Sequence, residues 1–162
     1  LLKELKDEKF PEDESSIKIR EASRAVLFDE NGLIPILHVA KHNYHKLPGG
    51  GIEKGEDIKT ALDREVEEET GCIVEIDNKI GIVTEYRSKW NIFQTSHCYI
   101  GRVIKRNKPR FTRDEIREGF RLVWLSLDEA IDQLQKDEPL DYQGRFIQQR
   151  DLAFLEEAKK FV

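Results

Sequence analysis

The chain has 162 residues, 38% of them hydrophobic and 36% charged, with a formal net charge of −5 at pH 7. That length and hydrophobic content suit a single domain with a real core, and the mild negative charge argues against a nucleic-acid partner. No apolar run reaches the roughly 20 residues of a membrane span, and the first residues lack the apolar core of a signal peptide, so we expect a cytoplasmic protein.

The N-terminal half predicts strands after a polar leader. Residues 1–16 are polar and acidic, and we expect a short arm or helix there, followed by one domain over residues 17–162. Residues 20–29 and 33–41 are rich in strand-forming residues and flank the turn signal Asp29 to Gly32, which predicts a hairpin. Pro35 within the second run argues for an edge strand or a bulge.

The rest of the chain predicts one early helix, several strands and two late helices. We expect a helix over residues 57–69, with Gly71 in a left-handed position just past its end. Strands are expected over residues 72–76, 79–87, 93–104 and 121–127, and helices over residues 128–134 and 141–160. This order indicates an α/β-type layered domain with a mixed sheet. We expect Cys72 and Cys98 to be buried free thiols and Trp124 to belong to the core.

The helix expected at residues 57–69 carries acids on its apolar side. At about 100° per residue, Glu65 and Glu69 continue the stripe of Leu62 and Val66, whereas Glu67 faces away from it. Burying unpartnered carboxylates costs on the order of several kcal/mol each, so positive charge must lie nearby. Because one arginine cannot neutralise three carboxylates, the cluster indicates a Mg²⁺ site that a phosphate substrate completes.

The spacing of these acids from a run of glycines matches a known pattern. Gly50, five residues, Glu56, seven residues, Arg64 and Glu65, and then Glu68, Glu69 and Gly71 resemble the Nudix box of the MutT-like superfamily. The departure is Cys72, which stands where the family usually has an aliphatic residue, and a buried cysteine behaves as a small hydrophobe.

The resemblance implies a fold and a reaction. The fold would be a Nudix-type α/β/α sandwich with a central mixed β-sheet. The reaction would be hydrolysis of a pyrophosphate bond in a nucleotide or nucleoside diphosphate derivative, by water attack on phosphorus with Mg²⁺ or Mn²⁺. Glu65, Glu68 and Glu69 would be metal ligands, with any one of them also a candidate for the base, and Gly50 would lend its carbonyl oxygen to a metal. Glu56 and Arg64 would orient the catalytic helix through a salt bridge.

Other candidates lie outside the box. A late loop supplies a further acid in many members of the family, and Glu115 or Glu118 is favoured over the neighbouring Asp114. Glu85 is a weaker candidate for that acid. The residues proposed to contact substrate are Lys46 for phosphate, Arg24 or its neighbour Arg20 on the first strand, and Tyr44 and Trp90 for a base.

An alternative function stays open at this level. A Nudix-like module can bind a nucleotide for regulation without cleaving it, but such a module has no need of three mutually repelling carboxylates. An enzyme acting on messenger-RNA 5′ ends has little support from an acidic chain without an extra domain. The sequence is compatible with a homodimer, and it selects neither the nucleotide, nor the number of metal ions, nor the general base.

Overall fold

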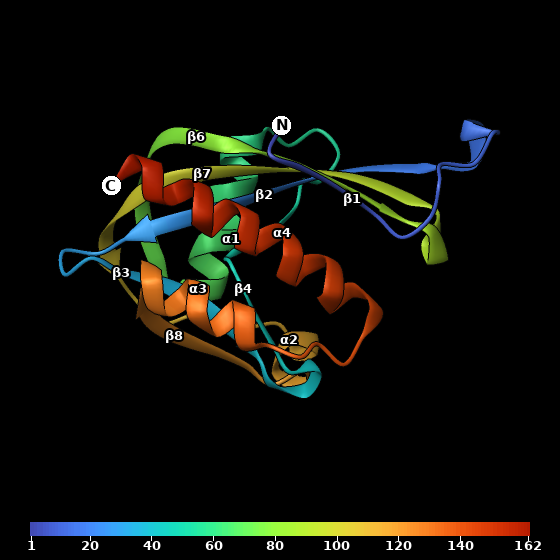
Figure 1. Cartoon of the computed structure of the whole chain (residues 1–162). Helices are drawn as coiled ribbons and strands as arrows, with labels where there is room; N and C mark the ends of the chain where they lie inside the picture. Colours follow the sequence, from blue (N-terminus) through green and yellow to red (C-terminus); the bar gives the residue numbers. More distant parts are fainter.

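The computed structural model describes all residues, 1–162, and consists of two β-sheets with helices on their faces (Figure 1). The larger sheet has the order β1-β6-β7-β2-β5 and the smaller has the order β4-β3-β8. The strands are β1 (Lys3–Lys6), β2 (Lys18–Phe28), β3 (Leu33–Val39), β4 (Tyr44–Lys46), β5 (Gly49–Gly51), β6 (Cys72–Arg87), β7 (Ile92–Arg106) and β8 (Phe120–Ser126). The α-helices are α1 (Ile58–Thr70), α2 (Arg113–Arg117), α3 (Leu127–Lys136) and α4 (Tyr142–Ala158).

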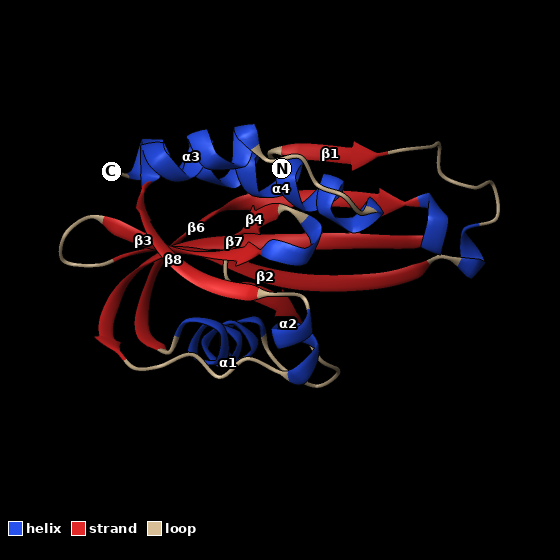
Figure 2. Cartoon of the chain, turned by 90° about the horizontal axis from the view of Figure 1, so that it is seen from below, coloured by secondary structure: helices blue, strands red, loops and turns tan.

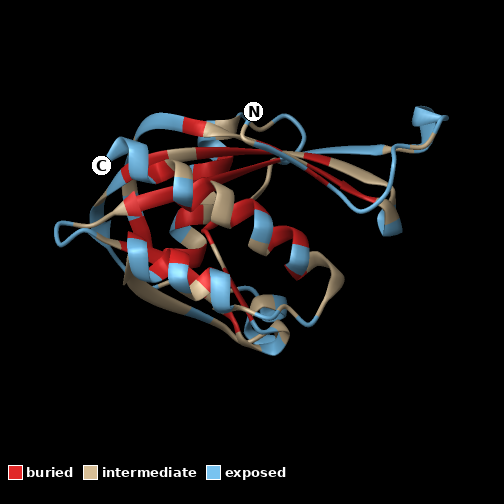
Figure 3. Cartoon of the chain, in the orientation of Figure 1, coloured by how far each residue is buried: buried red, intermediate tan, exposed pale blue.

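The sheets lie between two helical layers. Figure 2 shows α1 on one side of the strands and α3 with α4 on the other. The larger core cluster joins α3 and α4 to the sheets through residues such as Ile36, Val83 and Phe154, and a smaller one joins Leu62 and Val66 of α1 to β2. Buried residues accordingly concentrate where helices meet strands (Figure 3). The larger sheet contains both parallel and antiparallel pairs, so the expected mixed-sheet α/β sandwich is confirmed.

The expected hairpin over residues 20–41 is wrong. A tight turn does join β2 to β3, with the Asp29 N–H donating to the Leu33 carbonyl at 2.9 Å. However, β2 pairs with β7 and β5, whereas β3 crosses into the smaller sheet and pairs with β4 and β8. Both edges of β2 are therefore occupied along Ala22 to Arg24, and β3 has no free edge to join there. Pro35 lies in the part of β3 that pairs only with β8.

The first 16 residues differ from the expected arm or helix. They contain strand β1, which pairs in parallel with Val83 to Tyr86 of β6 and buries Leu5, and a single 3-10 turn at Glu14–Ser16. A four-residue strand has too little pattern of its own to reveal its partner.

The remaining expectations are largely met. Helix α1 begins after Asp57, whose side chain accepts a hydrogen bond from the Thr60 N–H at 2.7 Å, and ends at Gly71 with φ of 73°. The two strands expected at residues 72–87 form one bulged strand, β6. Cys72 and Cys98 are buried free thiols. Trp124 is partly buried: it packs against the smaller core cluster, and the Arg106 guanidinium lies over its ring, 3.6 Å from the centroid. None of the helices has the length and apolar character that a membrane crossing requires.

Candidate active site

A polar cleft of about 270 Å³ lies along strand β5, the last strand of the larger sheet. It collects side chains from distant parts of the chain, namely from β2, β4, α1, α4 and the segment around α2. Its charged lining residues are Glu65, Glu69, Glu115, Glu118 and Asp141 on the acidic side and Arg20, Arg24, His42 and Lys46 on the basic side. A cleft of this kind suits a ligand that combines anionic groups with a cation.

Helix α1 is held against the cleft at both of its ends. Within the loop that precedes it, Glu56 receives two hydrogen bonds from Arg64, Nε to Oε2 at 2.9 Å and Nη2 to Oε1 at 3.0 Å. At its C-terminal end, the Arg110 N–H donates to the Glu68 carbonyl at 2.6 Å, and Gly71 leaves no room for a Cβ beside the Asn107 carbonyl. These contacts hold the helix in one orientation, and the Glu56–Arg64 salt bridge is one of them.

Glu69 is the most deeply buried acid of the helix, with 2% of the residue exposed. Its Oε1 accepts a hydrogen bond from the Gly49 N–H at 2.8 Å, and its Oε2 lies 3.6 Å from Lys46 Nζ. Burial outweighs these two partners and raises the pKa of Glu69 from 4.5 to about 7. The helix therefore presents a carboxyl that is short of positive charge.

This raised pKa predicts an unusual pH dependence of stability. The folded chain holds the Glu69 proton more tightly than the unfolded chain, so its contribution to stability is full below pH 4.5 and is lost as pH rises through about 7. In a chelating buffer, the melting temperature should fall between about pH 4.5 and pH 7 and level off above that, and Glu69→Gln should reduce that fall. A melting temperature that falls equally in both proteins would contradict the assignment.

Glu65 and Glu68 extend the acidic cluster along the next turn. Arg64 Nη1 donates to Glu65 Oε1 at 3.0 Å and lies 3.8 Å from Glu68 Oε2. The Glu68 side chain is 36% exposed and does not line the cleft, but burial and the charge of Glu65 raise its pKa above the ordinary value. The single positive charge of Arg64 is thus shared among Glu56, Glu65 and Glu68, so the negative charge of these three carboxylates is only partly neutralised.

The chemistry of these donors fits a hard divalent cation, which prefers carboxylate oxygens. In the arrangement of the structure, no three acidic, histidine or cysteine side chains converge on one point. Arg64 and Lys46 hold the carboxylates instead, so an ion would take over oxygens that these cations now occupy. The argument that a divalent cation binds here therefore rests on two observations: the carboxylate oxygens are suitable ligands, and the positive charge around them is too small to neutralise them.

None of the three glycines of β5 has room for a Cβ atom. A Cβ on Gly49 would overlap the Ser23 carbonyl oxygen of β2 and would lie 3.0 Å from Arg24 Cδ, and one on Gly51 would lie 2.8 Å from Arg20 Nη2. A Cβ on Gly50 would lie 2.7 Å from the Glu65 carboxyl carbon. Because successive residues of a strand face opposite sides, the arginines lie on one face of β5 and Glu65 on the other.

The pairing register of β5 decides which glycine carbonyl could bind a metal ion, and it does not favour the expected Gly50. The Ala25 N–H donates to the Pro48 carbonyl and the Ile52 N–H donates to the Glu21 carbonyl. With Ser23 opposite Gly50, this alternation turns the Gly50 carbonyl toward β2 and leaves the Gly49 and Gly51 carbonyls at the outer edge. The Gly50 carbonyl is thus directed away from the edge where an ion would bind, and Gly49 is the better placed of the two.

Arg24 is the most unusual basic residue of the cleft. It is 6% exposed, and its Nε and Nη1 atoms are buried without any hydrogen-bond partner. Burial, reinforced by the charge of Arg150, lowers the pKa of Arg24 to about 10. A buried guanidinium without partners is costly, and a bound anion would offset that cost.

The other expected site residues have mixed outcomes. Lys46, Tyr44, Glu115 and Glu118 all line the cleft. Glu115 uses Oε1 to accept a hydrogen bond from the Thr112 N–H at 2.8 Å, and the nearest basic partner of Glu118 is His42 at 4.0 Å.

Two expected positions lie elsewhere. Trp90 does not line the cleft and instead packs edge-on against Tyr142, with ring centroids 5.1 Å apart. The carboxylate of Glu85 is fully buried between Arg87 and Arg150, so it is not available as a late-loop acid. The sequence could not show these contacts, because the partners Tyr142 and Arg150 come from a distant helix, α4.

The sequence pattern also missed several residues of the cleft. Asp141, Gln143 and Ile147, at the start of α4, line it together with Phe120 of β8. No motif marks them, because they reach the cleft only when α4 packs across the sheet.

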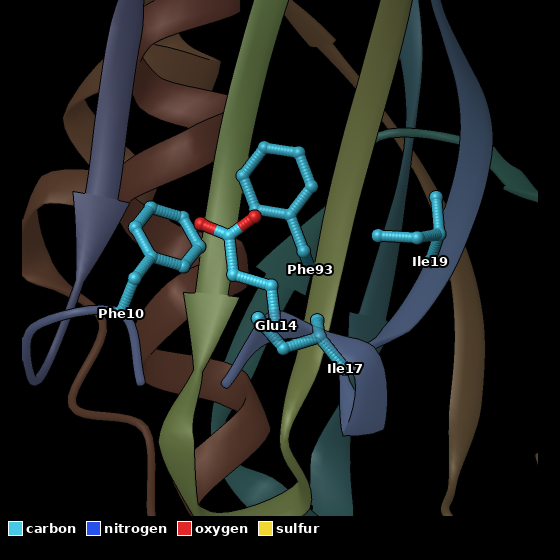
Figure 4. A pocket seen from close by; sticks show the side chains of 5 residues that line it. All are labelled: Phe10, Glu14, Ile17, Ile19 and Phe93. Carbon is cyan, nitrogen blue, oxygen red and sulfur yellow. The ribbon is translucent and has the colours of Figure 1, made fainter. Parts of the chain in front are cut away.

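A second hollow, of about 290 Å³, lies on the strands near the N-terminal 3-10 turn (Figure 4). Its lining is Phe10, Glu14, Ile17, Ile19 and Phe93. With four hydrophobic residues and no basic side chain, it offers nothing that would hold a phosphate.

Comparisons with known proteins find relatives in sequence and in fold. The family model described as NUDIX domain matches residues 18–146. An 8-oxo-(d)GTP phosphatase of Mycolicibacterium smegmatis is 29% identical over 114 residues, which is 70% of this chain and 33% of that protein. The chain therefore spans about a third of the length of this curated relative.

Solved structures show the same fold at low sequence identity. A NUDIX hydrolase from Nitrosomonas europaea has a TM-score of 0.64 and 20% identity, covering 89% of this chain and 90% of its own. A MutT protein from Methanosarcina mazei has a TM-score of 0.59 and 20% identity, covering 89% and 98%. An ADP-ribose pyrophosphatase from Streptococcus suis has a TM-score of 0.57 and 22% identity, covering 87% and 92%.

Proposed function

This chain belongs to the NUDIX family, as its sequence led us to expect, and we propose that it is a Mg²⁺- or Mn²⁺-dependent pyrophosphohydrolase. Its substrate is a nucleotide or nucleoside diphosphate derivative. One observation carries the proposal: under-neutralised carboxylates and the unpartnered Arg24 guanidinium line a single cleft. A diphosphate with its cation supplies the missing positive charge at the acids and the missing negative charge at the arginine.

The residues that hold the cation in this proposal are Glu65, Glu68 and Glu69, with the Gly49 carbonyl at the edge of β5. When bound, a divalent cation neutralises phosphate oxygens and lowers the pKa of a water molecule. The Glu56 and Arg64 pair keeps α1 in place, so the acids stay in position without reorganisation during the reaction.

The chain itself contributes positioning and charge. The oxygen of water attacks one phosphorus, the bond from that phosphorus to the bridging oxygen breaks, and two phosphate-bearing products leave. Glu115 or Glu118 accepts the proton of the water, since both carboxylates line the cleft outside the cation-binding cluster. Arg24 and Lys46 stabilise the negative charge that builds up on phosphate oxygens.

The substrate class is tested with a panel. The names of the relatives suggest 8-oxo-dGTP and ADP-ribose, to which we add dGTP and a UDP-sugar, each assayed with Mg²⁺, with Mn²⁺ and with EDTA. We expect hydrolysis of at least one member with a divalent cation and none with EDTA. Tight binding of a panel member without any turnover would instead favour the regulatory, non-catalytic alternative.

A further inference from the structure

The basic side of the cleft connects to a network of ionised side chains inside the domain. Arg87 Nη2 donates to Glu85 Oε2 at 2.6 Å, and Arg150 Nη1 donates to Glu85 Oε1 at 3.1 Å. Arg150 Nε donates to Asp151 Oδ1 at 2.7 Å, and Asp151 Oδ2 accepts the Leu47 N–H at 2.9 Å. The network thus extends from β6 through α4 to the turn that leads into β5.

This network leaves one positive charge over. Arg24, Arg87 and Arg150 are its buried guanidinium groups, while Glu85 and Asp151 are its buried carboxylates. Glu69 is a further buried carboxylate whose charge acts on Arg24, but its oxygens are held by Lys46 at 3.6 Å and by the Gly49 N–H at 2.8 Å. Both carboxylates already accept from Arg87, Arg150 or the Leu47 N–H, and Arg24 Nε and Nη1 receive no partner. A buried excess of charge is destabilising, and proteins keep such groups where a ligand completes them.

Arg20 adds a second cation beside Arg24. The two residues are four apart on β2 and therefore face the same side of the sheet, where they lie against Gly51 and Gly49. Both line the cleft. The missing Cβ atom of Gly51 leaves room for the Arg20 guanidinium against β5, and that of Gly49 leaves room for the backbone of β2 at Ser23 and Arg24.

We propose that Arg20 and Arg24 form a preorganised phosphate subsite, on the opposite face of β5 from Glu65, which binds an anion without the divalent cation. The positioning residues of this subsite are Glu85, Arg150 and Asp151. Because Arg150 donates hydrogen bonds to both carboxylates, neither of them pairs with Arg24, whose guanidinium stays available for an anion. This rests on the proposed function in one respect: the bound group is the phosphate of the diphosphate that lies away from the acidic cluster.

The subsite is tested by thermal unfolding in EDTA with inorganic phosphate and pyrophosphate as probes. In wild type, both anions should raise the melting temperature in a concentration-dependent manner. Arg24→Met should abolish that rise, and without anions it should melt at or above the wild-type temperature, because it removes an unpaired buried charge. Arg117→Met, on the exposed helix α2, is the matched control and should respond to the anions as wild type does.

Two glycine variants separate the two faces of β5. Gly51→Ala places a methyl group on Arg20, and should raise KM tenfold or more and weaken the phosphate response with kcat little changed. Gly50→Ala places a methyl group on the Glu65 carboxyl, and should lower kcat while the phosphate response in EDTA persists.

The outcomes distinguish this subsite from the proposed reaction. A phosphate response that survives both Arg24→Met and Arg20→Met overturns the subsite even if the enzyme turns over its substrate. An Arg24→Met protein that melts well below wild type also overturns it, because the guanidinium would then be satisfied in the free protein. A response lost in both variants upholds it, even if no panel member is hydrolysed. Arg24→Lys, which keeps the charge, should retain part of the response.

Discussion

Glu69→Gln and Glu65→Gln should each lower kcat for the hydrolysed panel member by a factor on the order of 100 or more. The amide oxygen of glutamine can still accept the Gly49 N–H, so the local fold is kept, but the charge that attracts a divalent cation is lost. The measurement is the initial rate over a range of Mg²⁺ concentrations. For Glu65→Gln we also expect the half-saturating Mg²⁺ concentration to rise.

Glu67→Gln is the matched control for these variants. Glu67 is on the same helix with its side chain 52% exposed, and its ionic partner is the exposed Arg110 at 3.7 Å. We expect a rate within about twofold of wild type, because exposed pairs contribute little free energy, on the order of 0 to 1 kcal/mol. Equal losses in all three variants would indicate a general effect of helix charge and would contradict a cation site on one face of α1.

Arg150→Met should lower the free energy of unfolding by about 3–5 kcal/mol, the range found when one partner of a buried ion pair is removed. Arg150, Glu85 and Asp151 are all 0% exposed, so the substitution leaves two carboxylates buried with fewer partners. Urea unfolding measures the change, and we expect an unchanged m value with a lower midpoint.

Lys136→Met is the control for this prediction, since Lys136 pairs with Asp132 at 2.7 Å on the surface of α3. We expect it to cost less than about 1 kcal/mol. If Arg150→Met lowered the free energy of unfolding as little as this control does, Arg150 would not be the partner that occupies the buried carboxylates of Glu85 and Asp151. The explanation for the unpartnered Arg24 would then be wrong. The contrast with Arg24→Met is the stronger result, because removing one of two buried arginines should be strongly destabilising and removing the other should not be destabilising at all.

The acidic helix was predictable because its information is local. Asp57 and Gly71 mark its ends, and a period of 3.6 residues separates Glu67 from Glu65 and Glu69. The pairing of Glu56 with Arg64 also follows from positions close in sequence. These are features that one helix and its preceding loop determine by themselves.

What the sequence did not reveal depends on register and on distant packing. Which glycine carbonyl faces the edge of β5 follows from its pairing with β2, and one residue of slip would reverse the answer. Strand polar residues such as Glu85 usually face solvent, and only the arrival of Arg150 from α4 explains why this one is buried. The crossing of β3 into the second sheet has the same origin, since distant strands β5 and β7 occupy the two edges of β2 and β3 pairs with β8 instead.

The central claim is that water attacks a phosphorus of a diphosphate in this cleft with the help of a divalent cation. The most direct measurement is hydrolysis of the best panel member in ¹⁸O-enriched water with Mg²⁺, followed by mass spectrometry of both products. We predict one ¹⁸O atom per turnover, bound to phosphorus in a single product, and no turnover in EDTA. Label on a carbon atom, or turnover that is undiminished by EDTA, would contradict the account.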